Sequence, residues 1–180
     1  RPSRFSPTEF WGDAARRAAL RAEALEHFRA LLRIDTTNPP GNEAAACAEI
    51  AAVLAREGIA HEIVETAPGR ACLVARLPAD APPTGRVPGS AGSGESPADA
   101  LLLSAHLDVV PADPACWRQP PFAAAIHDGC VWGRGAIDMK HMAAYSLAAL
   151  LAAKRSGLPR RRDLVFAAVA DEEAGSRFGA

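Results

Sequence analysis

Residues 101–113 read LLLSAHLDVVPAD, and this stretch decides the fold class of the chain. Three consecutive leucines are typical of a buried strand, and His106 and Asp108 stand at the end of the apolar run. Burying an ionised carboxylate without a partner is costly, so we expect a compensating charge beside Asp108. The stretch therefore predicts a core strand whose carboxyl end carries polar chemistry.

A second apolar run also ends in acids, because residues 163–173 read DLVFAAVADEE and place Glu172 and Glu173 after the strand. Between the two runs, residues 138–157 predict a helix with Asp138 as its N-cap and Gly157 as its stop. Strands that alternate with helices predict an α/β fold with a mostly parallel or mixed sheet flanked by helices.

The remaining segments fit the same architecture. An apolar stripe from Leu20 to Leu32 predicts a helix, and Asn42 begins a second one that ends at Gly58. Residues 61–65 and 71–77 predict two strands, and residues 123–135 predict a hairpin that turns at 128–129. Residues 79–99 are rich in Pro, Gly and Ser, which predicts a flexible insertion within one domain rather than a linker.

Composition excludes several classes of protein. The chain has 180 residues, 49% of them apolar, and a formal net charge of -1, which suits one globular domain and argues against nucleic acid or acidic lipid as a partner. No run is long enough to span a membrane, and the four scattered cysteines indicate ordinary reduced thiols. We expect a cytoplasmic protein. The chain starts at Arg1 rather than Met, so the presence of an upstream targeting segment is left open.

The polar groups at the two strand ends predict a metal site. In open α/β sheets, ligands bind beyond the carboxyl ends of the strands, where His106, Asp108, Asp138 and the Glu172–Glu173 pair would gather. Converging carboxylates repel one another unless a cation neutralises them, and His with carboxylate ligands suits Zn²⁺, with Mn²⁺ or Co²⁺ as alternatives. Because such a cation activates water, hydrolysis is the expected chemistry.

Each motif alone has a simpler interpretation. A single H-x-D is commonly a surface pair, DEE a solvated turn, and Asp138 only a helix cap. The sequence GRGAI lacks the glycine spacing and the Lys-Ser/Thr of a phosphate loop, which argues against a nucleotide-binding protein. Only the joint occurrence of the motifs in one short chain favours a metal centre. A non-catalytic binding or regulatory protein that retains the same scaffold is the alternative.

Four segments resemble the co-catalytic zinc metallopeptidase superfamily of aminoacylase, acetylornithine deacetylase, succinyl-diaminopimelate desuccinylase and glutamate carboxypeptidase. They read SAHLDVVP, GRGAIDMK, DEEAGSRFGA and IDTTNPPGNE. The first three match the motifs of this superfamily in order, and the fourth matches its usual N-terminal segment. The resemblance covers the chain outside residues 79–99 and implies a catalytic domain of the zinc exopeptidase type.

The resemblance implies a role for each candidate residue. His106 would bind one of two zinc ions, Asp108 would orient His106, and Asp138 would bridge the ions. Glu173 would bind the second zinc, and Glu172 would be the general base that activates the bridging water. The substrate would be a small peptide or an N-acyl amino acid with a free carboxylate, and we slightly favour a peptidase over a deacylase.

Two residues depart from the family pattern, since His141 and Ser176 stand where glycine is common. We do not interpret His141 as a ligand. The family takes a further acidic ligand and a later histidine from sequence that would lie beyond Ala180, where its lid and dimerisation domain would also follow. We therefore expect residues 1–180 to be the N-terminal part of a catalytic domain, inactive alone, with a homodimer formed through the lid domain.

Overall fold

A computed structural model describes residues 10–80 and 100–179 of the chain. The predicted insertion at 79–99 lies outside the described residues except for Ala79 and Asp80. The elements, in chain order, are α2 (Ala14–Arg33), α3 (Glu43–Arg56), β1 (Ala60–Ala67), β2 (Arg70–Leu77), β3 (Leu101–His106), the short 3₁₀ helix η1 (Pro114–Cys116), β4 (Ala125–His127), β5 (Cys130–Trp132), α4 (Lys140–Ser156) and β6 (Leu164–Val169).

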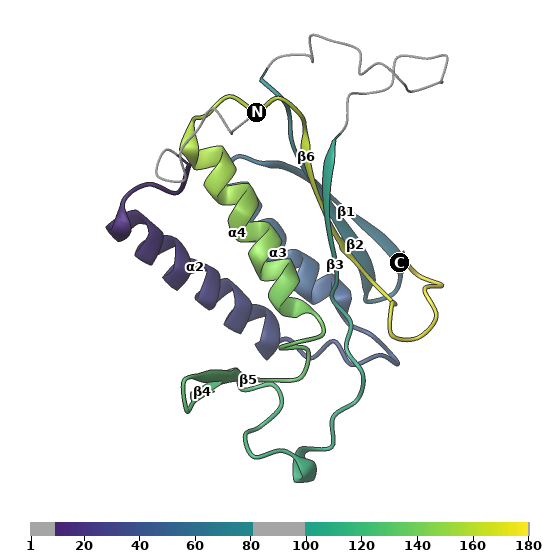
Figure 1. Ribbon diagram of the computed structural model, residues 1–180. Helices are drawn as coiled ribbons and strands as arrows, with labels where there is room; N and C mark the ends of the chain where they lie inside the picture. The colour runs from purple at the N-terminus through teal and green to yellow at the C-terminus, as the bar shows by residue number, and fades with distance from the viewer. Residues whose placement is uncertain (1–9, 81–99, 180) are drawn as a thin grey trace, which may run out of the picture.

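Four strands form a mixed sheet in the order β1-β2-β6-β3, which Figure 1 shows beside the helices. The β1–β2 and β2–β6 pairs are antiparallel, and the β3–β6 pair is parallel, with His106 opposite Val169. The mixed form of the predicted sheet is therefore correct. The predicted core position of β3 is wrong, because β3 is an edge strand of the described sheet and its first two leucines, Leu101 and Leu102, are 46% and 59% exposed. The parallel pair matters for function, because it brings the carboxyl ends of β3 and β6 to the same edge of the sheet.

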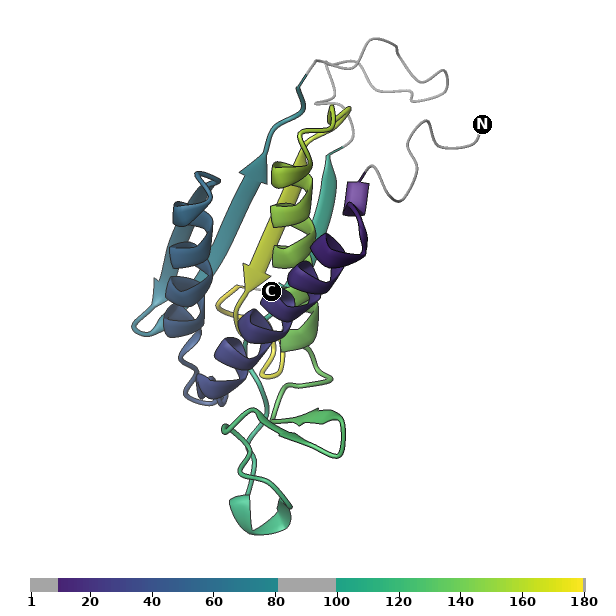
Figure 2. The ribbon, with the colours of Figure 1, turned by 90° about the vertical axis from the view of Figure 1, so that its left-hand side faces the viewer.

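The three long helices lie over one face of the sheet, in front of the strands in Figure 2. Helix α4 packs on β3 and β6, α3 packs on β1 and β2, and α2 packs mainly on α4. The core between these layers consists of fully buried side chains from every layer, among them Leu32, Ile50, Leu73, Leu150 and Phe166. Burying such side chains is the main force that holds the helices against the sheet.

Local sequence determines several of the element boundaries. Helix α2 begins after Asp13, whose carboxylate accepts a hydrogen bond of 2.8 Å from the backbone N–H of Arg16. The β4–β5 hairpin turns at Asp128 and Gly129, which have φ angles of 53° and 73°. Positive φ at both central residues is the type I′ requirement, and the Asp-Gly pair meets it. The predicted hairpin is thus confirmed.

The predicted cap of α4 is wrong. The helix begins at Lys140 after Met139, and Asp138 lies one residue further upstream. The Asp138 carboxylate instead approaches the ring of His106, so its side chain is available for chemistry rather than for the helix end. Among the residues described, no helix combines the length and apolar character needed to cross a membrane.

Arg155 joins the three helices at the end remote from these acids. Its guanidinium lies 2.6 Å from a Glu23 oxygen on α2 and 3.0 Å from a Glu57 oxygen at the end of α3. Hydrogen bonds from Arg155 hold the pKa of both carboxyl groups below the ordinary value of 4.5. Because both groups are partly exposed, we expect the network to contribute only about 1 kcal/mol.

We therefore expect Arg155→Gln to lower the free energy of unfolding by about 1 kcal/mol at pH 7. Because the folded pKa values lie below the unfolded ones, the loss should persist above about pH 4.5 and fade as the pH falls through the folded values. Urea unfolding of parent and variant between about pH 3 and pH 7 measures this. Lys154→Gln is the matched control, and a difference that grows in acid would contradict the assignment.

Candidate metal centre

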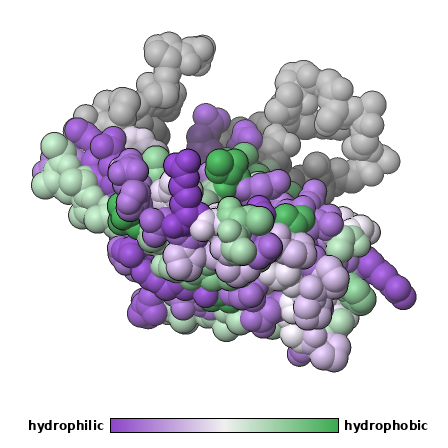
Figure 3. Space-filling model, turned by 90° about the horizontal axis from the view of Figure 1, so that it is seen from below, coloured by the Kyte–Doolittle hydropathy of each residue, from purple (hydrophilic) through white to green (hydrophobic). Residues whose placement is uncertain are grey.

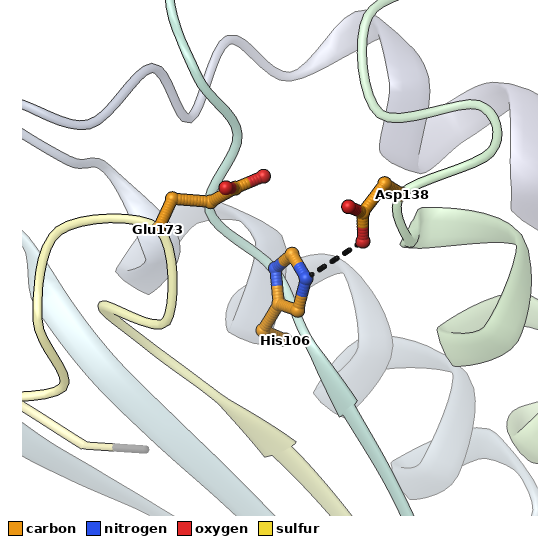
Figure 4. A group of neighbouring side chains, drawn as sticks. All are labelled: His106, Asp138 and Glu173. Atoms are coloured by element: carbon orange, nitrogen blue, oxygen red, sulfur yellow. Dashed lines mark hydrogen bonds and ion pairs between the residues drawn. The ribbon is translucent and has the colours of Figure 1, made fainter.

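The structure brings together the three residues that the sequence predicts as metal ligands. One ligand atom from each of His106, Asp138 and Glu173 lies within 4.8 Å of the others. His106 is the last residue of β3, Asp138 lies two residues before the start of α4, and Glu173 follows β6. Figure 4 shows the imidazole between the two carboxylates, which point toward the same space. The predicted convergence at one edge of the sheet is thus observed.

His106 and Asp108 are the buried floor of the cluster. The His106 Nδ1 atom is 3.0 Å from the backbone carbonyl oxygen of Asp108 and 3.4 Å from its Oδ1 atom. The opposite ring nitrogen, Nε2, is 3.1 Å from Oδ1 of Asp138. A proton on Nδ1 is held by these oxygens, which leaves Nε2 as the nitrogen that faces Asp138.

Asp108 also holds the loop that carries the two glutamates. Its Oδ1 accepts a hydrogen bond of 3.1 Å from the Glu172 N–H, and its Oδ2 accepts one of 3.0 Å from the Glu173 N–H. The Asp108 side chain is fully buried, so these bonds form where water does not compete. Sequence analysis predicted that Asp108 orients His106; the structure adds that the same carboxylate fixes the backbone of the neighbouring acids.

The charges in the cluster are strongly coupled. Burial alone would lower the pKa of His106, but hydrogen bonds with Asp108 and Asp138 outweigh it and raise this pKa to about 9. Burial would raise the pKa of Asp108, but bonds from His106, from Asn38 and from the amides of the two glutamates lower it to about 2. Without a cation, an imidazolium would therefore balance the buried carboxylate at neutral pH.

Burial raises the pKa of Glu173 above its ordinary value, and the carboxylates of Asp138, Glu172 and Asp108 raise it further against the opposing effect of His106. Mutual repulsion of this kind is relieved when a divalent cation binds between the acids. One imidazole and two carboxylates are also the donor types that catalytic Zn²⁺ sites use, commonly three protein ligands with one open position. The residues present fit the predicted metal.

Glu172 lies at the open side of the cluster. Its Oε2 atom is 3.7 Å from His106 Nε2, and 53% of its side chain is exposed, against 5% for His106. Beside it, a cavity of about 380 Å³ is lined by Asp138, Glu173 and the apolar side chains of Trp117, Trp132 and Ile137. Viewed from this end, the surface is a mosaic of hydrophilic and hydrophobic residues (Figure 3). A small amphipathic molecule could enter there.

A larger groove of about 570 Å³ lies between α2 and α4 and is lined by side chains that include Trp11, Phe28 and Tyr145. None of the five candidate residues borders it. The smaller cavity, in contrast, is lined by two of them, Asp138 and Glu173.

Sequence reasoning missed Asn38, which bridges the cluster and the acid before Glu172. Its buried side-chain amide donates one hydrogen bond of 2.8 Å to Asp108 and a second of 2.8 Å to Asp171. The signal was present, because Asn38 lies in the IDTTNPPGNE segment, but a single sequence does not reveal that this loop folds back under the strand ends. The first acid of DEE, Asp171, received no role for the same reason.

Lys140 was also missed. Its side chain is completely buried, and its Nζ donates to the carbonyl oxygens of Leu31 and Ile34 at 3.0 and 2.7 Å. These carbonyls belong to the end of α2, so Lys140 fastens the start of α4 to it. The signal was compositional, since only Lys140 and Lys154 are lysines among the 20 basic residues. Burial lowers the pKa of Lys140 to about 8.

The two departures from the family pattern lie outside the cluster. His141 is in the first turn of α4, where its ring meets that of Tyr145 edge-on at 5.7 Å. Ser176 has a φ angle of 57°, and its N–H donates to the carbonyl oxygen of Asp171 at 2.7 Å. That left-handed conformation favours glycine, so the serine adopts a backbone shape at some cost in strain.

The fold and the cluster together define a class of protein: an α/β domain with a candidate metal centre at the carboxyl ends of two parallel strands. Residues 102–180 match the model of the family described as Peptidase family M20/M25/M40. The matched segment contains all five candidate residues. Through this segment the chain is related to the M20 metallopeptidases, and the resemblance stated from the motifs is confirmed.

Particular relatives agree with this placement. A succinyl-diaminopimelate desuccinylase of Xanthobacter autotrophicus is 46% identical over 80 residues, which are 44% of this chain and 20% of that protein. The chain thus spans about a fifth of the length of the curated relatives it matches. Among solved structures, the dipeptidase Dug1p of Saccharomyces cerevisiae has a TM-score of 0.69 at 20% identity, with 94% of this chain and 36% of that chain covered.

The M20 family metallo-carboxypeptidase Sso-CP2 of Sulfolobus solfataricus has a TM-score of 0.61 at 23% identity, with 86% of this chain and 32% of that chain covered. At such identities the two solved structures establish the fold alone. The predicted α/β architecture with a mixed sheet is therefore similar to the folds of these two solved proteins.

Proposed function

We propose that this chain forms the N-terminal part of the catalytic domain of a metal-dependent hydrolase that cleaves an amide bond. The observation that carries the proposal is the convergence of His106, Asp138 and Glu173 within 4.8 Å at the ends of β3 and β6. Relationship to a family of hydrolases supports it. The proposed domain covers residues 1–180, and further metal ligands, a lid and a homodimer interface would be supplied by sequence that continues it.

The three converging residues would hold the metal, with Zn²⁺ as the proposed ion and Co²⁺ or Mn²⁺ as substitutes. A bound cation of this kind polarises an amide carbonyl and lowers the pKa of a nearby water molecule. Asp108 keeps the His106 ring oriented through its backbone carbonyl and its carboxylate, and it anchors the amides of Glu172 and Glu173. These contacts orient the His106 ring and the backbone of the two glutamates before the ion binds, which lowers the cost of ordering them.

Glu172 is the proposed general base. Its carboxylate is exposed, lies 3.7 Å from His106 Nε2, and has no other ion-pair partner among the described residues. It would take a proton from the attacking water at Oε2 and deliver that proton to the departing amine. A positioned carboxylate contributes about 10²–10⁴ to the rate in such a role.

Two substrate classes are candidates. Small peptides and N-acyl amino acids both present an amide and a carboxylate, and the aromatic cavity beside Asp138 and Glu173 suits a small apolar side chain. From the motifs we slightly favour small peptides. The similarity to a protein named succinyl-diaminopimelate desuccinylase instead favours an N-acyl amino acid, and this class is our second candidate.

The test uses the full-length protein, stripped of metal and then reloaded with Zn²⁺, against dipeptides, N-acetyl amino acids and N-succinyl amino acids. Stoichiometric Zn²⁺ with metal-dependent hydrolysis of one class supports the proposal. Tight Zn²⁺ binding with no turnover of any class would favour the alternative, a binding protein on the same scaffold. Thermal stabilisation by ATP but not by Zn²⁺ would favour a nucleotide-binding protein and contradict both.

A further inference from the structure

We propose that Arg70 is a positioning residue, which sets the geometry of the candidate metal site through a chain of buried hydrogen bonds. Arg70 is the first residue of β2, and its side chain is 7% exposed. It belongs to none of the motifs that carry the resemblance and does not touch the candidate ligands. The inference rests on the proposed function only in that it assigns the site a metal.

The first link is an ion-pair triad. Arg70 donates to both carboxylate oxygens of Glu43, from Nε at 2.7 Å and from Nη2 at 2.8 Å. The same Nη2 donates to Oδ1 of Asp171 at 2.9 Å. All three side chains are nearly or completely buried. A two-pronged bond of this type fixes the plane of the guanidinium, which in turn fixes where Asp171 lies.

The second link runs from Asp171 to the metal site. The Asn38 amide donates to Asp171 and to Asp108 at 2.8 Å each, so it holds the two carboxylates side by side. The Asp108 carboxylate then accepts hydrogen bonds from the backbone N–H groups of Glu172 and Glu173, and it also contacts the ring of His106. The bonds through Asn38 join buried side chains, whereas the two bonds from the glutamate amides are partly buried.

The loop after β6 is fastened by the same residues. The Oδ2 atom of Asp171 accepts hydrogen bonds from the N–H groups of Arg177 at 2.7 Å and Phe178 at 3.1 Å. The Phe178 ring lies under the Arg70 guanidinium, 5.2 Å from its central carbon. Asp171 therefore begins the segment that contains Glu172 and Glu173 and binds its other end, and Arg70 contacts Phe178 at that end.

The N-terminal loop is shaped around the same guanidinium. Arg70 Nη1 donates to the carbonyl oxygen of Pro40 at 3.0 Å. A Cβ atom on Gly41 would lie 2.3 Å from Arg70 Nε, so only glycine permits this approach, and the φ angle of 87° at Gly41 favours glycine independently. The guanidinium of Arg70 thus connects two loops, residues 38–43 and residues 171–178. These contacts give a structural role to the NPPGNE segment, which takes no direct part in the proposed reaction.

The first experiment measures positioning without any metal. In the metal-free full-length protein, the charge-balanced variant Glu43→Gln/Arg70→Gln removes the triad while keeping the net charge. Hydrogen exchange of the Glu172, Glu173 and Phe178 amides, followed by NMR, should become about tenfold faster or more, because their acceptors are no longer held. Amides within β6 should keep their protection. Unchanged exchange at the three loop amides would overturn the proposal.

The matched control is Arg76→Gln/Asp163→Asn. It removes another arginine–aspartate pair of β2, from the end of the strand remote from the site, where Arg76 is largely exposed. Exchange at the loop amides should stay at the parent rate in this variant. Faster exchange there in both variants would mean that any loss of an ion pair loosens the loop, which would overturn a specific role for Arg70.

The second experiment measures the effect on the site. Zn²⁺ affinity, determined by competition with a chromophoric chelator, should fall about 10- to 100-fold in Glu43→Gln/Arg70→Gln and stay unchanged in the control variant. The visible absorption bands of the Co²⁺-loaded variant should shift, because ligand geometry has changed. Parent-like Zn²⁺ affinity together with a parent-like Co²⁺ spectrum would overturn the proposal.

Two further outcomes are distinguishable. If the double variant does not fold, Asn38→Ala decides by the same measurements, since it removes one neutral side chain from the middle of the relay; parent-like exchange and affinity in that variant would overturn the proposal. If the parent protein itself binds no Zn²⁺, the proposed function fails, and the exchange experiment alone decides the role of Arg70.

Discussion

Replacing Glu172 with glutamine is expected to lower the turnover number of the full-length enzyme by about 10²–10⁴ while its Zn²⁺ content stays at the parent level. Glutamine keeps the size and the backbone position of Glu172, whose N–H donates to Asp108. It removes only the carboxylate that would accept the proton. Steady-state kinetics on the best substrate of the panel, with metal analysis of the same preparation, gives the result.

The control for this prediction is Glu62→Gln, an exposed acid on β1 with the same change of charge. It should leave both the rate and the metal content unchanged. If Glu172→Gln turns over substrate at the parent rate, the assignment of Glu172 as general base is wrong. If it loses metal as well, Glu172 is a ligand, and the division of roles between the two glutamates has to be reversed.

Replacing His106 with alanine is expected to remove metal and activity together. Mutating a residue that hydrogen-bonds a metal ligand typically lowers metal affinity by about 10- to 100-fold, and we expect the loss of His106 itself to lower it by more than that. The imidazole is the only nitrogen donor in the cluster of described residues, so the two remaining carboxylates would compete poorly for Zn²⁺. Metal analysis after dialysis and chelator competition measure the loss.

A folded but metal-free variant is the expected state, which circular dichroism and urea unfolding of the metal-free proteins verify. His127→Ala is the matched control, because His127 lies half-exposed in the β4–β5 hairpin beside Asp128. It should keep metal and rate. Normal Zn²⁺ content in His106→Ala would show that this histidine is not a ligand and would remove the observation on which the proposed function stands.

Periodicity and turn chemistry were sufficient to predict most of the secondary structure. The apolar stripe that ends at Leu31 and Leu32 is buried on α2, and the turn at 128–129 is where β4 meets β5. These features depend on residues close together in the chain, so a single sequence contains them. The predicted meeting of His106 with Glu173 also follows from a local rule, because His106 ends one apolar strand, Glu173 follows another, and the two strands pair in parallel.

Asp138 shows where local reasoning failed. An acid before a predicted helix is normally a cap, but the helix begins at Lys140, and the Asp138 carboxylate lies 3.1 Å from His106 instead. No partner is predicted for Lys140 from the sequence, yet this residue is fully buried against the end of α2. In both cases a partner from a distant part of the chain outweighed the local preference, and no short-range pattern names that partner.

The sequence by itself determined the class of this protein: an α/β domain whose apolar strands end in histidine and carboxylate groups suited to a divalent cation. Tertiary structure alone decided which buried groups lie behind those candidate ligands. The guanidinium of Arg70 binds both Glu43 and Asp171, which lie 128 positions apart in the chain (171 minus 43). Burying charges is tolerable only when they meet, and chain folding, not sequence spacing, determines which ones meet.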